Sequence, residues 1–265
     1  MYFRRSYSRW RLLLAPPRTG AENMARDSAL QARAARTGET VFSIYTWSHA
    51  TLSLGRNQIA RGRYDLDKLR AAGIDVVRRP TGGRAILHHR EVTYSVTAPV
   101  EERRSLHDTY GRINDLLRAG LGALGVLAQP AIATGQAPMP GMRPCFDVPS
   151  EGELVADGSK LVGSAQWREN GALLQHGSIL VDDDQSSLPV YTRAGESATS
   201  RIGAPATLRA LLGRSPKAEE VAEAMFEAVR NLEDPEATEL REEDVRSEAL
   251  GRVPHFLDEE WTWRR

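Results

Sequence analysis

GSKLVGSAQWRENGALLQHGSIL, residues 158–180, contains the pattern that decides the fold. Two stretches of strand-forming residues, Leu161–Arg168 and Ala172–Val181, flank Asn170–Gly171, and Asn-Gly is the strongest short-range signal for a β-hairpin. Asp157–Gly158 marks a second hairpin turn directly upstream, after a shorter strand. The segment therefore predicts three consecutive antiparallel strands.

Small residues interrupt both long strands of this hairpin. The first strand contains Gly163, Ser164 and Ala165, and His176-Gly177-Ser178 repeats the feature in the second. If the strands pair across their turn, the two groups lie close together and leave room for a ligand in a narrow apolar slot. For His176 the pattern leaves two interpretations open, a slot residue and a core histidine with its hydrogen bonds satisfied.

The rest of the chain mixes helical and strand patterns, which predicts an α+β fold with helices packed on a mixed, largely antiparallel sheet. Residues 130–144 are rich in Pro, Gly and Met and predict a long loop. Residues 185–265 are expected to form a helical C-terminal part that packs on a single catalytic domain, with a charged tail and one short helix after 234. The expected strands are Trp10–Ala15, Val41–Trp47, Thr51–Leu54, Asp75–Arg79, Arg84–Leu87, Val92–Ala98 and Glu153–Ala156, and the expected helices are 18–37, Leu66–Ala72, Leu106–Leu124, 205–213 and 216–232.

The composition narrows the class of protein. The chain has 265 residues, 41% of them hydrophobic, and equal numbers (35 each) of basic and acidic residues, so it lacks the basic surplus of a general nucleic-acid binder. A single cysteine excludes an intrachain disulfide. No run approaches the length of a membrane span, and Leu12–Ala15 is too short for a signal-peptide core. We expect a cytoplasmic monomer without membrane or nucleic-acid partners.

RRPTGGRAILHH, residues 78–89, is the first segment whose residues suggest a binding site. A strand delivers Arg78 and Arg79 to a turn in which Gly82 and Gly83 expose bare backbone amides. Amides beside arginine form a cradle for an anionic group, such as the pantetheine-phosphate arm of a carrier. A plain strand–turn–strand with surface arginines is the alternative.

Two further side chains are candidates for chemistry. Cys145 ends the long loop between Pro144 and Pro149, an unusual place for a core residue, and is a candidate nucleophile; a small buried hydrophobe is the alternative. Lysine occurs only three times among 35 basic residues, and Lys160 begins a strand. Its compact ammonium donates protons as arginine cannot, although a solvated hairpin residue would look the same.

Patterns for metals and nucleotides are missing from the sequence. His88, His89, His107 and His176 lack the spacing of zinc ligands, and neither a GxxxxGK[ST] loop nor a GxGxxG motif occurs. We expect no metal and no cofactor.

Four segments in this order resemble the lipoate–biotin protein ligase superfamily. They are NMARDSAL (Asn23–Leu30), YTWSHATLSLGRNQ (Tyr45–Gln58), RRPTGGRAILHH, and KLVGSAQ with LQHGSIL. The resemblance runs from near Trp10 to about Asp183, and residues 185–265 match it poorly. It implies a mixed sheet with flanking helices and an acyl slot between the Gly-Gly turn and the small-residue strands.

Within the superfamily, CFDVPSEGELVADGSKLVGSAQ resembles the cysteine-dependent octanoyltransferase group that acts on the glycine-cleavage H protein. The CF-x-x-PS segment of that group carries the nucleophile, which maps onto Cys145, and its lysine maps onto Lys160. ATP-dependent ligases keep the lysine and lack this cysteine. Two departures stand out: Glu151-Gly152 replaces an aromatic pair, and His88-His89 replaces a His-Asp pair.

The resemblance implies transfer of octanoate from acyl carrier protein, through a thioester on Cys145, to a lysine on the glycine-cleavage H protein or an E2 lipoyl domain. Lys160 would favour the thiolate and handle the amine proton, and the oxyanion donors stay open between two glycine segments. An ATP-dependent lipoate ligase and a non-catalytic lipoyl-domain binding module are the alternatives. The implied substrate-binding residues are Arg79, Thr81, Gly82, Gly83, Arg84, His88, Gly163, Ser164, Ala165, His176 and Gly177.

Overall fold

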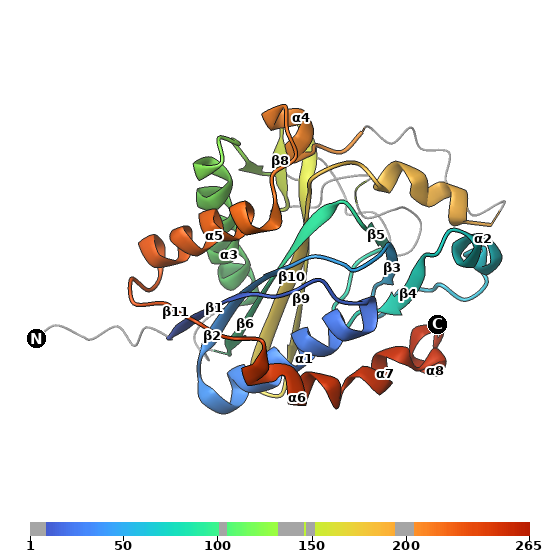
Figure 1. Cartoon of the computed structure of the whole chain (residues 1–265), viewed down its shortest axis with the longest axis horizontal. Helices are drawn as coiled ribbons and strands as arrows, with labels where there is room; N and C mark the ends of the chain where they lie inside the picture. Colours follow the sequence, from blue (N-terminus) through green and yellow to red (C-terminus); the bar gives the residue numbers. More distant parts are fainter. Residues whose placement is uncertain (1–8, 101–104, 132–145, 147–151, 194–203) are drawn as a thin grey trace, which may run out of the picture.

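Figure 1 shows a computed structural model of the chain, which describes all residues except 1–8, 101–104, 132–145, 147–151 and 194–203. A large sheet forms its centre. Strands pair in parallel only at the β11–β1–β2 edge, and every other neighbouring pair is antiparallel. The strand order across the sheet is β11 (Thr238–Glu239), β1 (Trp10–Leu14), β2 (Thr40–Tyr45), β6 (Glu91–Pro99), β10 (Ala172–Leu180), β9 (Ser159–Glu169), β8 (Leu154–Ala156) and β7 (Gln129–Pro130). The predicted α+β class is confirmed.

Both predicted hairpin turns are present. Asn170 and Gly171 have φ angles of 48° and 78°, and Asp157 and Gly158 have 49° and 76°. Positive φ at both central residues is the type I′ geometry, which matches the right-handed twist of the flanking strands. The turn pairs β9 with β10 as expected.

Helices cover both faces of the sheet because its strands alternate in the direction of their side chains. In β2, Phe42 and Ile44 belong to the apolar cluster under α3 (Leu106–Ala123) and α5 (Ala218–Leu232). Val41 and Tyr45 face α1 (Gly20–Thr37) on the other side, where α6 (Glu243–Leu250) and α7 (Val253–Leu257) pack beyond it.

Helix α1 starts at a capping box. Thr19 accepts a hydrogen bond from the Glu22 backbone, and the Glu22 carboxylate accepts one from the Thr19 backbone. The helix ends at Gly38, whose φ is 73°. This cap satisfies amides of the first turn that have no partner within the helix, so the predicted 18–37 helix begins two residues later.

A second, three-stranded sheet lies beside the large one. Its order is β4 (Asp75–Arg78), β3 (Thr51–Leu54) and β5 (Ile86–His88), and α2 (Leu66–Ala71) and the 3-10 helix η1 (Gln185–Tyr191) pack on it. The sequence predicted these strands but not their separation from the main sheet. Residues 79–85 connect β4 to β5, which places the RRPTGG segment, residues 78–83, next to the β9–β10 hairpin.

The end of the chain differs from the expected charged tail with one helix. Strand β11 extends the large sheet in parallel with β1, and three short helices follow, α6, α7 and α8 (Glu259–Thr262). Phe256 is buried and the indole of Trp261 donates to the carbonyl of Arg78, at 2.9 Å. The shorter helix α4 (Leu208–Leu212) precedes α5. Within the described residues, no helix is both long and apolar enough to cross a membrane.

Candidate active site

A cavity of about 370 Å³ lies between the RRPTGG segment and the β9–β10 hairpin. One wall comes from the small sheet, the other from the large sheet, and α1 and α3 close its sides. Its described lining consists of Met24, Tyr45, Trp47, Ser53, Arg79, Gly82, Gly83, Arg84, Ile86, His88, Thr93, Tyr110, Glu153, Gly163, Ser164, Ala165, Gln166, His176, Gly177 and Ser178. The slot that the resemblance implied is therefore present at the expected place in the fold.

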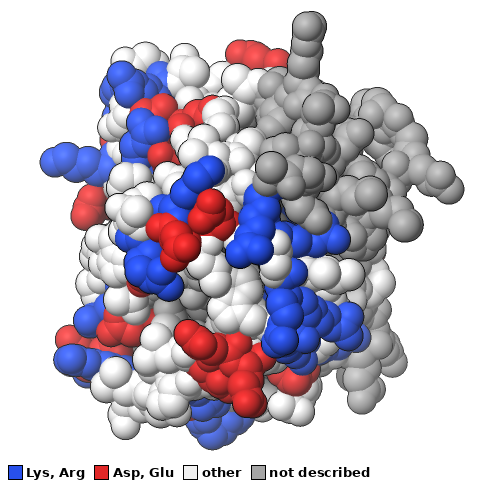
Figure 2. Space-filling view, turned by 90° about the vertical axis from the view of Figure 1, so that its right-hand side faces the viewer, with Lys and Arg blue, Asp and Glu red and all other residues white. Residues whose placement is uncertain are grey.

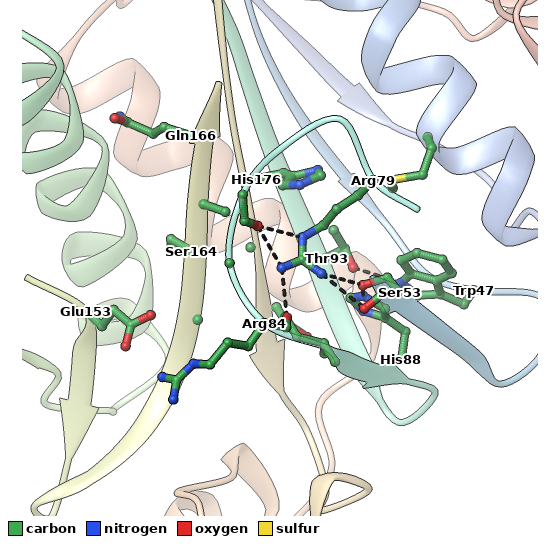
Figure 3. A pocket seen from close by; sticks show the side chains of 18 of the residues that line it. Trp47, Ser53, Arg79, Arg84, His88, Thr93, Glu153, Ser164, Gln166 and His176 are labelled. Atoms are coloured by element: carbon green, nitrogen blue, oxygen red, sulfur yellow. Dashed lines mark hydrogen bonds between the residues drawn. The ribbon is translucent and has the colours of Figure 1, made fainter. Parts of the chain in front are cut away.

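Arg79 shapes the RRPTGG segment from inside. Its guanidinium is buried and donates to the carbonyls of Gly82 and Arg84, each at 2.8 Å, and to Ser53 (Figure 3). The planar fork of donors thus fixes several points of one turn at once. Arg79 lines the cavity, but these bonds direct its donors to the loop itself.

Gly55 and Gly83 let the RRPTGG segment pass close to the backbone that follows β3. A Cβ on Gly55 would lie 2.0 Å from the carbonyl oxygen of Gly83, and Gly83 has a φ of 93°. A Cβ on Gly83 would also lie 2.7 Å from Nη2 of Arg79. Only residues without a side chain fit both positions.

The facing wall has the predicted row of small residues. Gly177 pairs with Ser164 and His176 with Ala165 across the hairpin. Gly177 leaves space for the Tyr94 ring, which a Cβ there would approach to 2.7 Å. The Tyr94 hydroxyl donates to Oγ of Ser164 at 2.7 Å, and burial raises the pKa of Tyr94 to about 12, so the hydroxyl keeps its proton.

His176 belongs to a buried chain of hydrogen bonds behind the cavity. Its Nδ1 lies 2.8 Å from Oδ2 of Asp27, which also accepts from the Tyr45 hydroxyl. Its Nε2 lies 2.6 Å from Oγ1 of Thr81. A carboxylate only accepts, so a neutral ring donates from Nδ1 and accepts the Thr81 proton at Nε2. His176 both lines the cavity and ties helix α1 to the RRPTGG segment.

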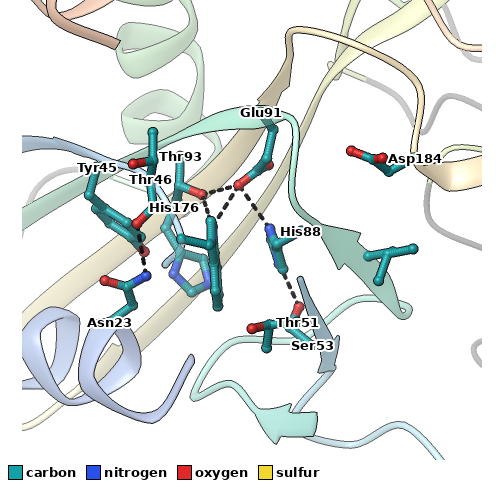
Figure 4. A network of polar contacts seen from close by, with 12 residues as sticks. Asn23, Tyr45, Thr46, Thr51, Ser53, His88, Glu91, Thr93, His176 and Asp184 are labelled. Atoms are coloured by element: carbon teal, nitrogen blue, oxygen red, sulfur yellow. Dashed lines mark hydrogen bonds and ion pairs between the residues drawn. The ribbon is translucent and has the colours of Figure 1, made fainter. Parts of the chain in front are cut away.

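His88 forms a second chain at the other side of the cavity (Figure 4). Its Nδ1 lies 3.0 Å from Oε1 of Glu91, and its Nε2 lies 2.8 Å from Oγ of Ser53. The ring stacks on Trp47 with 4.0 Å between centroids, and Trp47 donates to the same Glu91 oxygen. Burial lowers the pKa of His88, which favours the neutral ring.

Lys160 is buried rather than solvated, so the interpretation as a surface hairpin residue is wrong. Its ammonium lies 2.7 Å from Oε1 of Glu153, which is also buried and lines the cavity. It also lies 4.8 Å from the centre of the Phe146 ring. A Cβ on Gly163 would lie 3.1 Å from both Phe146 and the Lys160 side chain, so the three meet behind the cavity wall.

The predicted site residues divide into three groups. Cys145 lies outside the described residues. Lys160 and Thr81 do not line the cavity, although each contacts a residue that does. The predicted binding residues that line it are Arg79, Gly82, Gly83, Arg84, His88, Gly163, Ser164, Ala165, His176 and Gly177.

Sequence reasoning missed several polar residues of the site. Asp27, Glu91 and Glu153 anchor the two histidines and the lysine. Ser178, which the small-residue pattern included, also lines the cavity, and its buried hydroxyl has no hydrogen-bond partner among the described residues. Asp27 alone had a detectable signal, because it follows Asn23 by four residues on an otherwise apolar helix face.

The model of the lipoyl protein ligase A/B catalytic domain matches residues 19–230. The chain belongs to this family. An octanoyltransferase LipM from Kyrpidia tusciae is 38% identical over 97% of this chain and 99% of its own length. The LipM of Symbiobacterium thermophilum is 44% identical over 66% of each protein. This lipoyl protein ligase A/B family member is therefore an acyltransferase of protein lipoylation.

Solved structures share the fold of this family. A lipoate-protein ligase A bound with ATP has a TM-score of 0.78 at 21% identity, covering 96% of this chain and 98% of that one. A lipoate protein ligase from Thermoplasma acidophilum, solved with its E2 lipoyl domain, has the same TM-score and identity and covers 97% of each chain. The likeness to relatives and structures continues beyond Asp183, where the sequence resemblance ended, because the C-terminal elements are part of the shared fold.

Proposed function

We propose that the chain takes an octanoyl group from its thioester on acyl carrier protein, carries it on Cys145, and transfers it to a lipoyl-domain lysine. The acceptor is a glycine-cleavage H protein or an E2 lipoyl domain. The names of the LipM relatives and the cavity in the slot position support this proposal. We also propose that the chain acts as one catalytic domain, in which residues 185–265 pack on the sheet.

Phe146 is the observation that carries the proposal. It is the residue after Cys145, and its ring packs against Lys160 at the back of the cavity wall. Consecutive Cα atoms are about 3.8 Å apart, so the neighbour of a fixed residue has a short reach. We therefore assign the chemistry of Cys145 to the wall that Phe146 joins, where an ammonium favours a thiolate.

In the first half-reaction, the Cys145 thiolate attacks the carbonyl carbon of the carrier thioester. The new C–S bond forms as the bond to the pantetheine sulfur breaks, and the leaving thiolate takes up a proton. The Lys160 ammonium stabilises the negative charge of the attacking sulfur. Its pairing with Glu153 holds the ammonium in place without adding net charge to the buried region.

In the second half-reaction, the neutral amine of the acceptor lysine attacks the octanoyl–cysteine thioester. An amide bond forms, the bond to Cys145 breaks, and the proton lost by the amine is taken up by the released Cys145 thiolate. This step runs downhill because an amide is more stable than a thioester. We assign Lys160 and Glu153 as the acid–base pair that assists this proton transfer.

The experiment incubates the protein with octanoyl acyl carrier protein, without ATP, and measures the intact mass. We expect a gain of one octanoyl group that hydroxylamine removes and that Cys145→Ala does not show. Acylation of a lipoyl domain that requires ATP and free acid, and that persists in Cys145→Ala, would instead identify an ATP-dependent ligase. Co-precipitation with a lipoyl domain and no covalent product under either condition would identify a binding module.

A further inference from the structure

Three arginines at the edge of the site have no acidic partner. In the described part of the chain, the side chains of Arg56, Arg264 and Arg265 form no ion pair with a carboxylate. Other surface arginines, for example Arg90 and Arg214, pair with aspartate or glutamate. Unpaired cations of this kind are available to an external anion.

Two tryptophans hold Arg56 and Arg264 in place. The Arg56 guanidinium lies 4.1 Å from the ring centre of Trp167 and 5.5 Å from that of Trp261. Arg264 stacks on Trp261, also at 4.1 Å, and donates to the Arg56 carbonyl at 2.6 Å. Stacking on aromatic faces fixes the guanidinium groups and leaves donors at their edges, other than Nη2 of Arg264, to bind further oxygen atoms.

The arginines are close enough to repel one another. Burial, followed by repulsion from Arg56 and Arg265, lowers the pKa of Arg264. The nearest acidic residues of this segment, Asp258–Glu260, are at the opposite end of α8. Basic side chains gather accordingly on the face that carries the end of the chain (Figure 2). An anionic partner on this face would relieve the repulsion.

This surface adjoins the cavity. The Arg56 backbone amide donates to the carbonyl of Thr81 at 2.7 Å, within the RRPTGG segment. Trp167 follows Gln166, which lines the cavity from the other wall. The arginine surface is therefore connected to both walls of the slot.

We propose that Arg56, Arg264 and Arg265 form the docking surface for an acidic acyl carrier protein, an inference that rests on the proposed function. The donor brings two kinds of negative charge, acidic side chains on the carrier and the phosphodiester of its pantetheine arm. The acceptor instead presents a lysine, whose ammonium the arginines repel. The chemistry of this surface thus matches the first half-reaction.

The test compares two octanoyl donors in the first half-reaction, octanoyl acyl carrier protein and the small thioester S-octanoyl-N-acetylcysteamine. The variants are Arg264→Glu/Arg265→Glu and Arg265→Glu alone, and the control is Arg230→Glu. Arg230 is exposed on α5, away from the end of the chain (Figure 1), so it gives the same charge change as Arg265→Glu at another surface.

We expect the double variant to raise KM for the carrier about tenfold or more, with kcat changed less than about twofold. The single variant should show a smaller rise, and the control none. Turnover of the small thioester should stay within about twofold in all three. Raising the salt concentration should raise the KM of the wild type for the carrier toward the KM of the variants.

Three results would overturn the docking surface. They are an unchanged KM for the carrier, an equal loss with the small thioester, and a defect confined to transfer from acylated enzyme to the lipoyl domain. Carrier binding to Cys145→Ala, measured by fluorescence anisotropy, separates this inference from the proposed function. If the carrier binds in a charge-dependent way but no acyl-enzyme forms in the wild type, the docking surface would be supported and the thioester mechanism would be rejected.

Discussion

The two walls of the cavity are held by different forces. On the small-sheet side, Arg79, His88 and their partners form a continuous set of hydrogen bonds with few charges exposed to the slot. On the β8–β9 side, the described polar contacts include an ion pair between Lys160 and Glu153, beside the hydrogen bond from Tyr94 to Ser164. Hydrogen bonds fix the shape of the small-sheet wall, and an ion pair places charge in the β8–β9 wall. Substitutions in the two walls should therefore have different effects on stability and activity.

The largest effect is expected at the charged wall. Lys160→Met leaves the Glu153 carboxylate buried without its cation, which should destabilise the protein by about 3–5 kcal/mol. Acyl-enzyme formation should fall by about a hundredfold or more, because the Cys145 thiolate loses its stabilising charge. Denaturant unfolding and intact-mass kinetics measure the two effects.

Lys160→Met/Glu153→Gln is the matched control for this prediction. Removing both charges should restore most of the stability and none of the rate. Recovery of the rate in the double variant would show that Lys160 acts only through packing and has no part in the chemistry.

The shape of the hydrogen-bonded wall is tested at Gly55. Gly55→Ala places a Cβ 2.0 Å from the Gly83 carbonyl oxygen, and backbone must move to accommodate it. We expect a loss of about 1–3 kcal/mol in unfolding free energy and a higher KM for the acyl donor. Gly111→Ala on α3 meets nothing within 4 Å and should stabilise by about 0.5–1 kcal/mol. Similar results for the two variants would show that the loop is not tightly packed.

The small-sheet wall should also give the protein an acid-side pH dependence. The pKa of buried His88 is lowered from 6.5, so the fold favours its neutral form. Its contribution to stability is present above pH 6.5 and is lost as pH falls below that value toward the lowered pKa. In His88→Gln, the unfolding free energy should therefore decline less between pH 7.5 and 5. An unchanged decline would assign the pH dependence to other groups.

The smallest effect concerns the length of the acyl chain. Met24 lines the cavity from α1, and Met24→Ala enlarges it. Each methylene is worth about 0.8 kcal/mol, so preference should shift toward decanoyl by roughly fourfold per methylene in kcat/KM. Leu30→Ala on the same helix is buried away from the cavity and should cost stability without changing chain preference. A shift in both variants would reflect general loosening.

Local patterns predicted one wall of the site well. Asn170–Gly171 fixed the pairing of β9 with β10, and that pairing brought Ser164 opposite Gly177. The turn determines the register, so the small-residue row followed from a few neighbouring residues. The position of the slot came from the family resemblance and agrees with the cavity.

The polar partners could not be predicted in the same way. Asp27 and His176 are 149 residues apart, and only the packing of α1 on the sheet brings them together. Arg78 is harder still, because it bonds to the backbone carbonyls of Gly55, Gln58 and Thr262. Every residue has a carbonyl, so such contacts leave no pattern in the sequence.

The Arg78 contacts also set an order of events during synthesis. Arg78 emerges from the ribosome 184 residues before Thr262, one of its acceptors. At about 5–20 residues per second, that interval is roughly 10–40 s. For this time the loop before the RRPTGG segment lacks its last anchor, and the arginine surface at Arg264 does not yet exist. The RRPTGG segment and the arginine surface are therefore completed together, once residues 262–265 have left the ribosome.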